Sequence, residues 1–252
     1  MQFVSATAEK GEVSMKIVRR LTLFSVLAVL VAIGSGCATS GRYIAFREFQ
    51  PSIEQAAASP LQGKSVYVEK FAYEPYAGRK RPPTITEEPP GFTYHKMSKE
   101  DETLWNQEVK TLRPAFHKSD ANRVGFVRNG FGAAMSGVFT LNDPGDWLKQ
   151  CIELELKQQG ATVAAAPENA DLVVGGKIIW LEVDMYMQYW ADLITDFAIT
   201  PRGGPPVERT IHTHGSQGAW SSSSFEYYQP VRMCLQKTYL LLQPEIDKAL
   251  KR

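Results

Sequence analysis

The sequence predicts an α+β fold, a two-layer sandwich in which two amphipathic helices pack on one face of a mostly antiparallel sheet. Two observations predict it. Three long strand-like runs follow one another between residues 168 and 220 with only short breaks, which is typical of an antiparallel meander. Segments with apolar residues at helical spacing precede and follow this meander, so both helices can cover one face of the sheet.

Shorter strands precede the meander. "KSVYVEKFAY" alternates from Val66 through Val68 and predicts the first strand. "RVGFVRNGFG" predicts a strand over 123–128 with a turn at Asn129-Gly130, "SGVFTL" predicts the next strand, and "ATVAAA" predicts a short one. The meander consists of "ENADLVVGGKIIWLEVDMYM", "QYWADLITDFAIT" and "ERTIHTHGSQGAW", with a turn at 202–206 between the last two.

The first helix has a signal at each end. In "NDPGDWLKQCIELELKQQG", Asp143 suits the N-cap, Pro144 the first helical position and Gly160 the C-terminal stop. The apolar side chains that share one face at helical spacing are Trp147, Leu148, Cys151, Ile152 and Leu154.

The second helix closes the chain. Ser223 and Glu226 have capping-box spacing, although Pro230 is an alternative start. Pro244 is expected to kink the helix. Its apolar stripe, suited to packing on a sheet, consists of Val231, Leu235, Tyr239, Leu242, Ile246 and Leu250.

The chain is expected to divide into a signal peptide at 1–36, a small, polar tether at 37–63 and a single domain at 64–252. Within the domain, residues 74–122 are polar and rich in proline, so we expect a long excursion with a short helix around 99–110. The formal net charge of +1 gives no case for a nucleic-acid partner.

The segment "MKIVRRLTLFSVLAVLVAIGSGC" predicts export. Lys16, Arg19 and Arg20 form a positive region, and the apolar run at 21–33 is too short to span a membrane. The first fourteen residues look out of place before this segment, so we expect either that Met15 is the true start of the chain or that residues 1–14 extend the positive region.

The end of this segment, Ser35-Gly36-Cys37, resembles the lipobox of bacterial lipoproteins, although Gly34 stands where leucine is usual. The resemblance implies cleavage before Cys37, followed by attachment of a diacylglycerol and an acyl chain (palmitate-type) to this residue. Several acyl chains hold a protein stably on a membrane. Ala38 is not the aspartate that signals inner-membrane retention, so the resemblance implies the periplasmic face of the outer membrane.

The run "VGFVRNGFG…VFTLNDPGDWLKQCIELELKQQGATVAAAPENADLVVGGKIIWLEVD" resembles the YajG-type family of bacterial lipoproteins over roughly residues 64–250. The resemblance implies a small α+β domain without catalytic residues.

His212 and His214 are the candidate metal ligands. Residues i and i+2 of a strand share a face, so the two imidazoles can grip one ion if His95, His117, Glu208 or Asp192 supplies a third ligand. Two solvent-facing histidines are the alternative that we favour, and we therefore predict no metal and no cofactor beyond the lipid.

Cys151 and Cys234 are the thiols that remain once Cys37 is acylated. A disulfide between them is allowed in an oxidising compartment, but we favour two buried free cysteines.

The run "WLEVDMYMQYW" gathers aromatic and methionine side chains at a strand end and its hairpin. We expect Trp180, Tyr186, Tyr189 and Trp190 to form a partner surface together with the 74–122 excursion. The alternative is that about half of them fill the core. Glu182 and Asp184 share a strand face and are expected to pair with lysine or arginine across the sheet.

These observations favour a lipoprotein of the cell envelope whose domain binds or supports another envelope component without catalysis. One alternative is an auxiliary subunit of a lipid-transport system, which needs an apolar groove between helices and sheet. A further alternative is a periplasmic metal-binding protein or enzyme, for which no catalytic motif is present in the sequence.

Overall fold

The computed structural model describes residues 41–48, 51, 59–75, 79–128, 131–218 and 223–251. The predicted signal peptide, Cys37 and the turn at 129–130 lie outside these described residues. The described part of the chain is an α+β domain that begins at Gly41.

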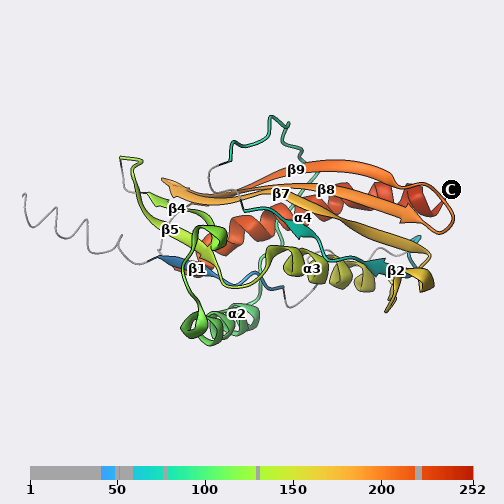
Figure 1. Cartoon of the computed structure of the whole chain (residues 1–252), viewed down its shortest axis with the longest axis horizontal. Helices are drawn as coiled ribbons and strands as arrows, with labels where there is room; N and C mark the ends of the chain where they lie inside the picture. Colours follow the sequence, from blue (N-terminus) through green and yellow to red (C-terminus); the bar gives the residue numbers. More distant parts are fainter. Residues whose placement is uncertain are drawn as a thin grey trace, which may run out of the picture. The chain divides into compact units, whose positions relative to one another are not determined.

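A long antiparallel meander is the centre of the domain, as the sequence predicts (Figure 1). It consists of β7 (Leu172–Tyr186), β8 (Gln188–Pro201) and β9 (Val207–Gly218). β8 pairs with β7 along its whole length on one side and with β9 on the other. β9 has no further strand partner in the described chain, so its outer edge is the edge of the sheet.

The other edge of β7 pairs with three short parallel strands in succession, so the sheet is mixed and open. These strands are β2 (Ser65–Val68), β3 (Ala72–Tyr73) and β4 (Arg123–Arg128). β5 (Ala134–Thr140) pairs antiparallel with β4, and β6 (Thr162–Val163) pairs parallel with β2. The antiparallel character that the sequence predicts therefore belongs to the meander and to β4–β5, while the other pairings are parallel.

The segment at 41–48 corrects the expectation of a tether up to residue 63. β1 (Arg42–Ile44) pairs parallel with β5, and Ile44, Ala45 and Phe46 are fully buried. Glu48 forms a buried ion pair with Arg232, with 2.8 Å between Oε2 and Nε. The domain therefore includes this segment, which was expected to belong to the tether because residues 38–63 are small and polar with few apolar anchors.

Among the described residues, three α-helices accompany the sheet, one more than the two that define the predicted layer. α3 (Pro144–Gln158) begins as predicted, with Asp143 accepting from the amides of Gly145 and Asp146, and Gly160 follows it with φ of +89°. α2 (Lys99–Leu112) confirms the helix expected within the excursion, and its Trp105 donates to the carbonyl of Ala45.

α4 (Ser224–Leu250) runs along the meander and packs on β7, β8 and β9 (Figure 1). Its N-cap is Ser223, which accepts from the amide of Glu226, and the helix contains both Pro230 and Pro244. Five residues of the predicted stripe are buried and Leu250 is partly buried against the same core. No helix among the described residues is long and apolar enough to cross a membrane.

α3 packs against β2, β3, β6 and β7. Its buried apolar side chains are Trp147, Leu148, Cys151, Ile152 and Leu156, so Leu156 takes the place expected of Leu154. These side chains and those of α4 belong to the same buried cluster as the strands. Short 3₁₀ helices occur at Arg113–Ala115 (η1), Asp120–Asn122 (η2) and Pro167–Asn169 (η3).

Candidate functional site

The face of the meander opposite α4 carries a cluster of polar side chains; we call this face the open face. Thr213 points to α4, because its hydroxyl donates to the carbonyl of Cys234 at 3.1 Å. Its neighbours His212 and His214 therefore lie on the open face, since side chains alternate along a strand. Asp192 of β8 is the register partner of His214 and lies on the same face.

Asp192 is the centre of this cluster. Its Oδ1 lies 3.2 Å from Nε2 of His212 and 3.1 Å from Nδ1 of His214, and its Oδ2 lies 2.8 Å from a guanidinium nitrogen of Arg81. Burial by itself raises the pKa of the Asp192 carboxyl, but the bonds from the two histidines and the charge of Arg81 outweigh it. The pKa of Asp192 is therefore held well below its usual range. We call Arg81, Asp192, His212, His214 and Trp190 the open-face cluster.

Arg81 reaches Asp192 from residues 79–98, a segment that we call the strap. Thr84 lies 3.0 Å from Nδ1 of His212, and the amide of Glu87 donates to the carbonyl of His212 at 2.7 Å. The strap thus bonds to the free edge of β9. The described part of the predicted excursion is packed on the fold.

The strap then continues onto α4. Lys237 of α4 pairs with Glu88 at 2.6 Å, and Gln236 binds both the amide and the carbonyl of His95. Arg232 also donates to the carbonyl of His95. The strap therefore connects the open face to the helix across the edge of the sheet.

Two further carboxylates lie beside Asp192 on the open face. Asp184 is fully buried and pairs with Arg128 of β4 at 2.7 Å, which is the cross-sheet partner expected for it. Glu182 accepts from the indole of Trp180 at 3.2 Å. Burial, together with the charges of Asp184 and Asp192, raises the pKa of Glu182. Asp184 and Asp192 therefore each pair with an arginine, whereas the hydrogen-bond partner of Glu182 is the indole of Trp180 and not the lysine or arginine expected for it.

The aromatic residues expected to form a partner surface divide into two groups. Tyr189 is 1% exposed and packs edge-on against Tyr227 with 4.7 Å between ring centroids, and Trp180 is 4% exposed. These two residues are buried, which corrects the expectation for them. Trp190 is half-buried with its ring stacked on that of His214, and Tyr186 is 41% exposed. Of the four residues, only Trp190 and Tyr186 are therefore accessible to a partner.

His212, His214 and Asp192 lie together, but they do not surround a common position that a metal ion could occupy. Both imidazoles approach the same oxygen of Asp192, and the guanidinium of Arg81 binds the other. Among the described residues, no group of three or more His, Cys, Asp or Glu side chains is arranged to hold a metal ion. His95 faces α4 instead, through its backbone.

The contacts of His212 also bear on catalysis. The chain Thr84–His212–Asp192 has the connectivity of a nucleophile, a base and an orienting acid. However, both ring nitrogens of His212 are bound within the protein, because Nε2 faces Asp192 and also Arg81 at 3.0 Å. The side chain is 1% exposed, so a substrate has no access to the imidazole.

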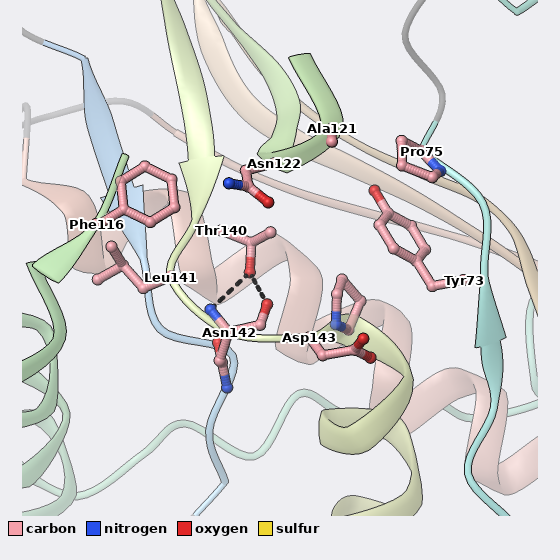
Figure 2. A pocket seen from close by; sticks show the side chains of 10 residues that line it. Tyr73, Pro75, Phe116, Ala121, Asn122, Thr140, Leu141, Asn142 and Asp143 are labelled. Carbon is pink, nitrogen blue, oxygen red and sulfur yellow. Dashed lines mark hydrogen bonds between the residues drawn. The ribbon is translucent and has the colours of Figure 1, made fainter. Parts of the chain in front are cut away.

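A hollow of about 420 Å³ lies where β3, β5 and the start of α3 meet (Figure 2). Figure 2 shows Tyr73 extending toward it from one side and Asn122 and Phe116 from the other. The hydroxyl of Tyr73 is buried without a hydrogen-bond partner, and burial raises its pKa. Asn142 is fixed by two bonds to the backbone of Phe46, at 2.7 and 2.6 Å. No pattern in the sequence marks Tyr73.

A second hollow of about 510 Å³ lies over β3, β7, β8 and β9, and its charged lining includes Lys177, Asp196 and Arg209. The lining of the first hollow mixes aromatic, proline and amide side chains. Neither is the apolar groove between helix and sheet that a lipid-transport subunit requires.

Cys151 and Cys234 are free and buried. Burial raises the pKa of both thiols. A thiol in this state is a poor nucleophile.

Comparisons with known proteins find only distant structural similarities. No family model matches the chain, and no curated protein matches it. A Xanthomonas campestris protein of family DUF330 is 12% identical over 81% of this chain and 92% of its own, with a TM-score of 0.46. A hypothetical protein of Chlamydia trachomatis is 10% identical over 75% and 98%, with a TM-score of 0.27. PelC of Paraburkholderia phytofirmans, a dodecamer, is 12% identical over 80% and 95%, with a TM-score of 0.21. Similarities of this size do not establish a shared fold or function.

Proposed function

We propose that this protein is a lipoprotein of the outer membrane, held on its periplasmic face by a diacylglycerol and an acyl chain on Cys37, and that its domain binds another envelope protein without catalysis. The export segment and the Ser35-Gly36-Cys37 pattern support the anchor. The orientation of His214 by Asp192 supports the binding role, and this observation carries the proposal.

A binding surface gains affinity when its side chains are held in position before the partner arrives. His214 is 40% exposed, and its Nδ1 is fixed by an acid that is itself 2% exposed. Trp190 stacks on the same imidazole, at 6.2 Å and 27°. Aromatic side chains of this kind are enriched among the residues that dominate protein interfaces. The open-face cluster therefore offers a partner a rigid aromatic and polar contact.

In this proposal the helices form one layer and the sheet the other, a two-layer arrangement of the described domain. α3 and α4 contribute to one buried cluster with the strands, while His212 and Thr213 point to opposite faces. The open face is then free for the partner except where the strap crosses it.

The test is capture of the partner by cross-linking in the envelope, with the anchored protein as bait. His214→Ala and Trp190→Ala are expected to lose the cross-linked complex. His117→Ala is the matched control, because His117 is also exposed but lies outside the cluster, and it is expected to keep the complex. Melting temperatures of all variants are measured alongside.

Capture that is unchanged in both cluster variants would contradict the proposed surface. The anchor has a separate test: Cys37→Ala is expected to lose acyl labelling and membrane fractionation. Acyl labelling that persists in this variant would overturn the assignment of Cys37.

The lipid-transport alternative and the metal or enzyme alternative predict other results. Lipid that co-purifies with protein lacking its own acyl chains would favour the first. Stoichiometric binding of zinc or copper, lost in His214→Ala, would favour the second. The similarity to YajG-type lipoproteins stays a hypothesis within this proposal.

A further inference from the structure

One end of the sheet carries most of the exposed apolar side chains. Six large hydrophobic residues are exposed among the described residues, and four of them lie in or beside the β4–β5 and β7–β8 turns. Their exposed fractions are 96% for Phe131, 81% for Met187, 41% for Tyr186 and 39% for Met135. We call these four residues the apolar tip.

The two turns lie beside each other. β4 pairs parallel with β7 in the register Val127↔Met185, so both strands run toward the same end (Figure 1). A side chain placed on Gly132 would come within 3.4 Å of the ring of Tyr186, which shows that the turns touch. Hairpin turns are ordinarily polar, so an apolar group at two adjacent turns indicates a contact with an apolar phase or a partner.

The chain also enters the domain at this end. β1 pairs parallel with β5, with Arg42 opposite Val138, so the first residue of β1 points toward the apolar tip. Figure 1 shows the start of β1 at the same end of the sheet as the two turns. Cys37 precedes Arg42 by five residues, which span about 17 Å when fully extended.

The length of this linker is similar to the distance along the sheet from Arg42 to the apolar tip. Arg42 is level with Val138, and β5 begins four residues nearer the tip, at Ala134. A rise of ~3.3 Å per residue places Ala134 about 13 Å beyond the level of Arg42. A lipid on Cys37 therefore holds this end of the sheet within reach of the bilayer surface.

Exposed basic side chains flank the point of entry. The guanidinium of Arg113 lies 4.7 Å from the ring centroid of Tyr43, and the ammonium of Lys118 lies 5.5 Å from it. Cations beside an apolar or aromatic contact suit anionic lipid headgroups.

From these observations we propose that the apolar tip inserts into the interface of the bilayer that holds the anchor, so that the domain stands on the membrane in a fixed orientation. The inference rests on the proposed acylation of Cys37. It adds a second, non-covalent membrane contact and leaves the open-face cluster along the side of the standing domain.

The test uses the full-length, acylated protein in vesicles of phosphatidylethanolamine and phosphatidylglycerol. The native cysteines do not interfere, because Cys37 is acylated and the other two are buried. A single introduced cysteine in Phe131→Cys or Met187→Cys is labelled with an environment-sensitive fluorophore. Pro206→Cys is the control, since it is exposed in the turn after β8, at the opposite end of the meander.

Labels at 131 and 187 are expected to be quenched by nitroxide lipids and protected from aqueous iodide, with the reverse at 206. Labels at 131 and 187 that iodide quenches would overturn the inference, because the tip would then lie in water. Protection from both quenchers would also overturn it, because the tip would then be covered by protein, such as a second copy of the chain.

An apolar fluorophore can itself draw the labelled site into the bilayer, so a second variant tests the native side chains. Met187 has φ of +63°, which asparagine tolerates, so Phe131→Ser with Met187→Asn removes the apolar character without straining the turn. In this background, lipid quenching of a label at Met135→Cys is expected to be lost; unchanged quenching would contradict insertion by the tip. Flotation with the vesicles reports the anchor separately, so a protein that does not float refutes the acylation rather than the tip.

Discussion

Replacing Asp192 by asparagine tests whether this residue holds the open-face cluster and the strap together. Asparagine keeps the shape and one accepting oxygen for the histidines. Its amide nitrogen, however, faces the guanidinium of Arg81 where a carboxylate oxygen now accepts at 2.8 Å. The variant therefore opposes two donors at the point where an ion pair forms in the wild type.

The expected loss of unfolding free energy in Asp192→Asn follows from the burial of Asp192 and Arg81. Removing one partner of a fully buried ion pair costs about 3–5 kcal/mol. Asp192 is 2% exposed, but the side chain of Arg81 is 42% exposed and can regain water. Exposed pairs contribute about 0.2–1 kcal/mol, so we expect a loss between these limits, at about 2 kcal/mol. For a chain of this size that corresponds to a fall in Tm of about 4–8 °C.

The assay is equilibrium unfolding in urea, with amide hydrogen exchange in the strap as a local readout. The unfolding midpoint should fall while the denaturant dependence stays the same. The amide of Glu87, which donates to the carbonyl of His212, should exchange faster than in the wild type. The control is Asp196→Asn on the same strand and face, because Asp196 accepts from Thr210 and asparagine preserves that bond. This control should stay within about 0.5 kcal/mol of the wild type.

A midpoint equal to that of the wild type, with unchanged exchange in the strap, would refute the reasoning. Asp192 would then contribute nothing to holding the strap, and the strap would be held by its contacts with α4 alone.

The remaining predictions concern pH, the hairpin aromatics and the thiols. Because the folded-state pKa of Asp192 is lowered, its contribution to stability is present above the unfolded value near ~3.9 and is lost as pH falls toward the folded value. The stability difference between the wild type and Asp192→Asn, measured in urea, should therefore shrink as the pH falls below about 4. Tyr189→Ala should cost about 3–5 kcal/mol on unfolding, against less than about 0.5 kcal/mol for Tyr186→Ala; equal costs would place both side chains in one environment. Cys151 and Cys234 should resist alkylation in the native protein and both react once it is unfolded without reductant; a missing thiol would reveal a disulfide.

The sequence predicted the parts of the fold that are held by local signals. α3 carries its own cap, first-turn proline and terminal glycine, so its ends need no tertiary information. The meander was equally predictable from the sequence, because long strands joined by short turns pair with their neighbours in sequence.

Elements held by distant partners could not be predicted in the same way. β1 has only three residues, and its pairing with β5 spans about 96 positions. Its burial depends on Phe46 and Glu48 meeting α3 and α4, as Phe46 does with Trp147 at 5.0 Å. Nothing in the composition of 38–63 indicates these contacts.

The same distinction applies to the candidate site: the residues placed by local spacing were predicted, and the residue brought in by a distant segment was not. Spacing along β9 placed His212 and His214 on one face, and Asp192 was among the possible third ligands. Arg81 was missed because it lies in a proline-rich stretch 131 residues from His212, and only the folded path of the strap brings it to the acid. Whether Tyr189 is buried depends on which face of β8 packs against α4, and an aromatic run by itself does not determine that face.

The arginines on the open face have a common arrangement that links the site to the rest of the domain. Asp192 and Asp184 are both buried acids of the meander, and each is paired with an arginine from outside it, Arg81 of the strap and Arg128 of β4. A buried ion pair is no more stabilising than a well-packed apolar pair, so stability alone does not account for two of them on one face. A charge pair does fix position, because a shifted partner leaves a buried carboxylate unpaired. Arg81 thereby sets the strap against His214, and Arg128 sets the β4–β5 turn against the β7–β8 turn. In our proposals these are the two surfaces that meet the partner and the membrane, so the acids of β7 and β8 fix the two contacts relative to each other.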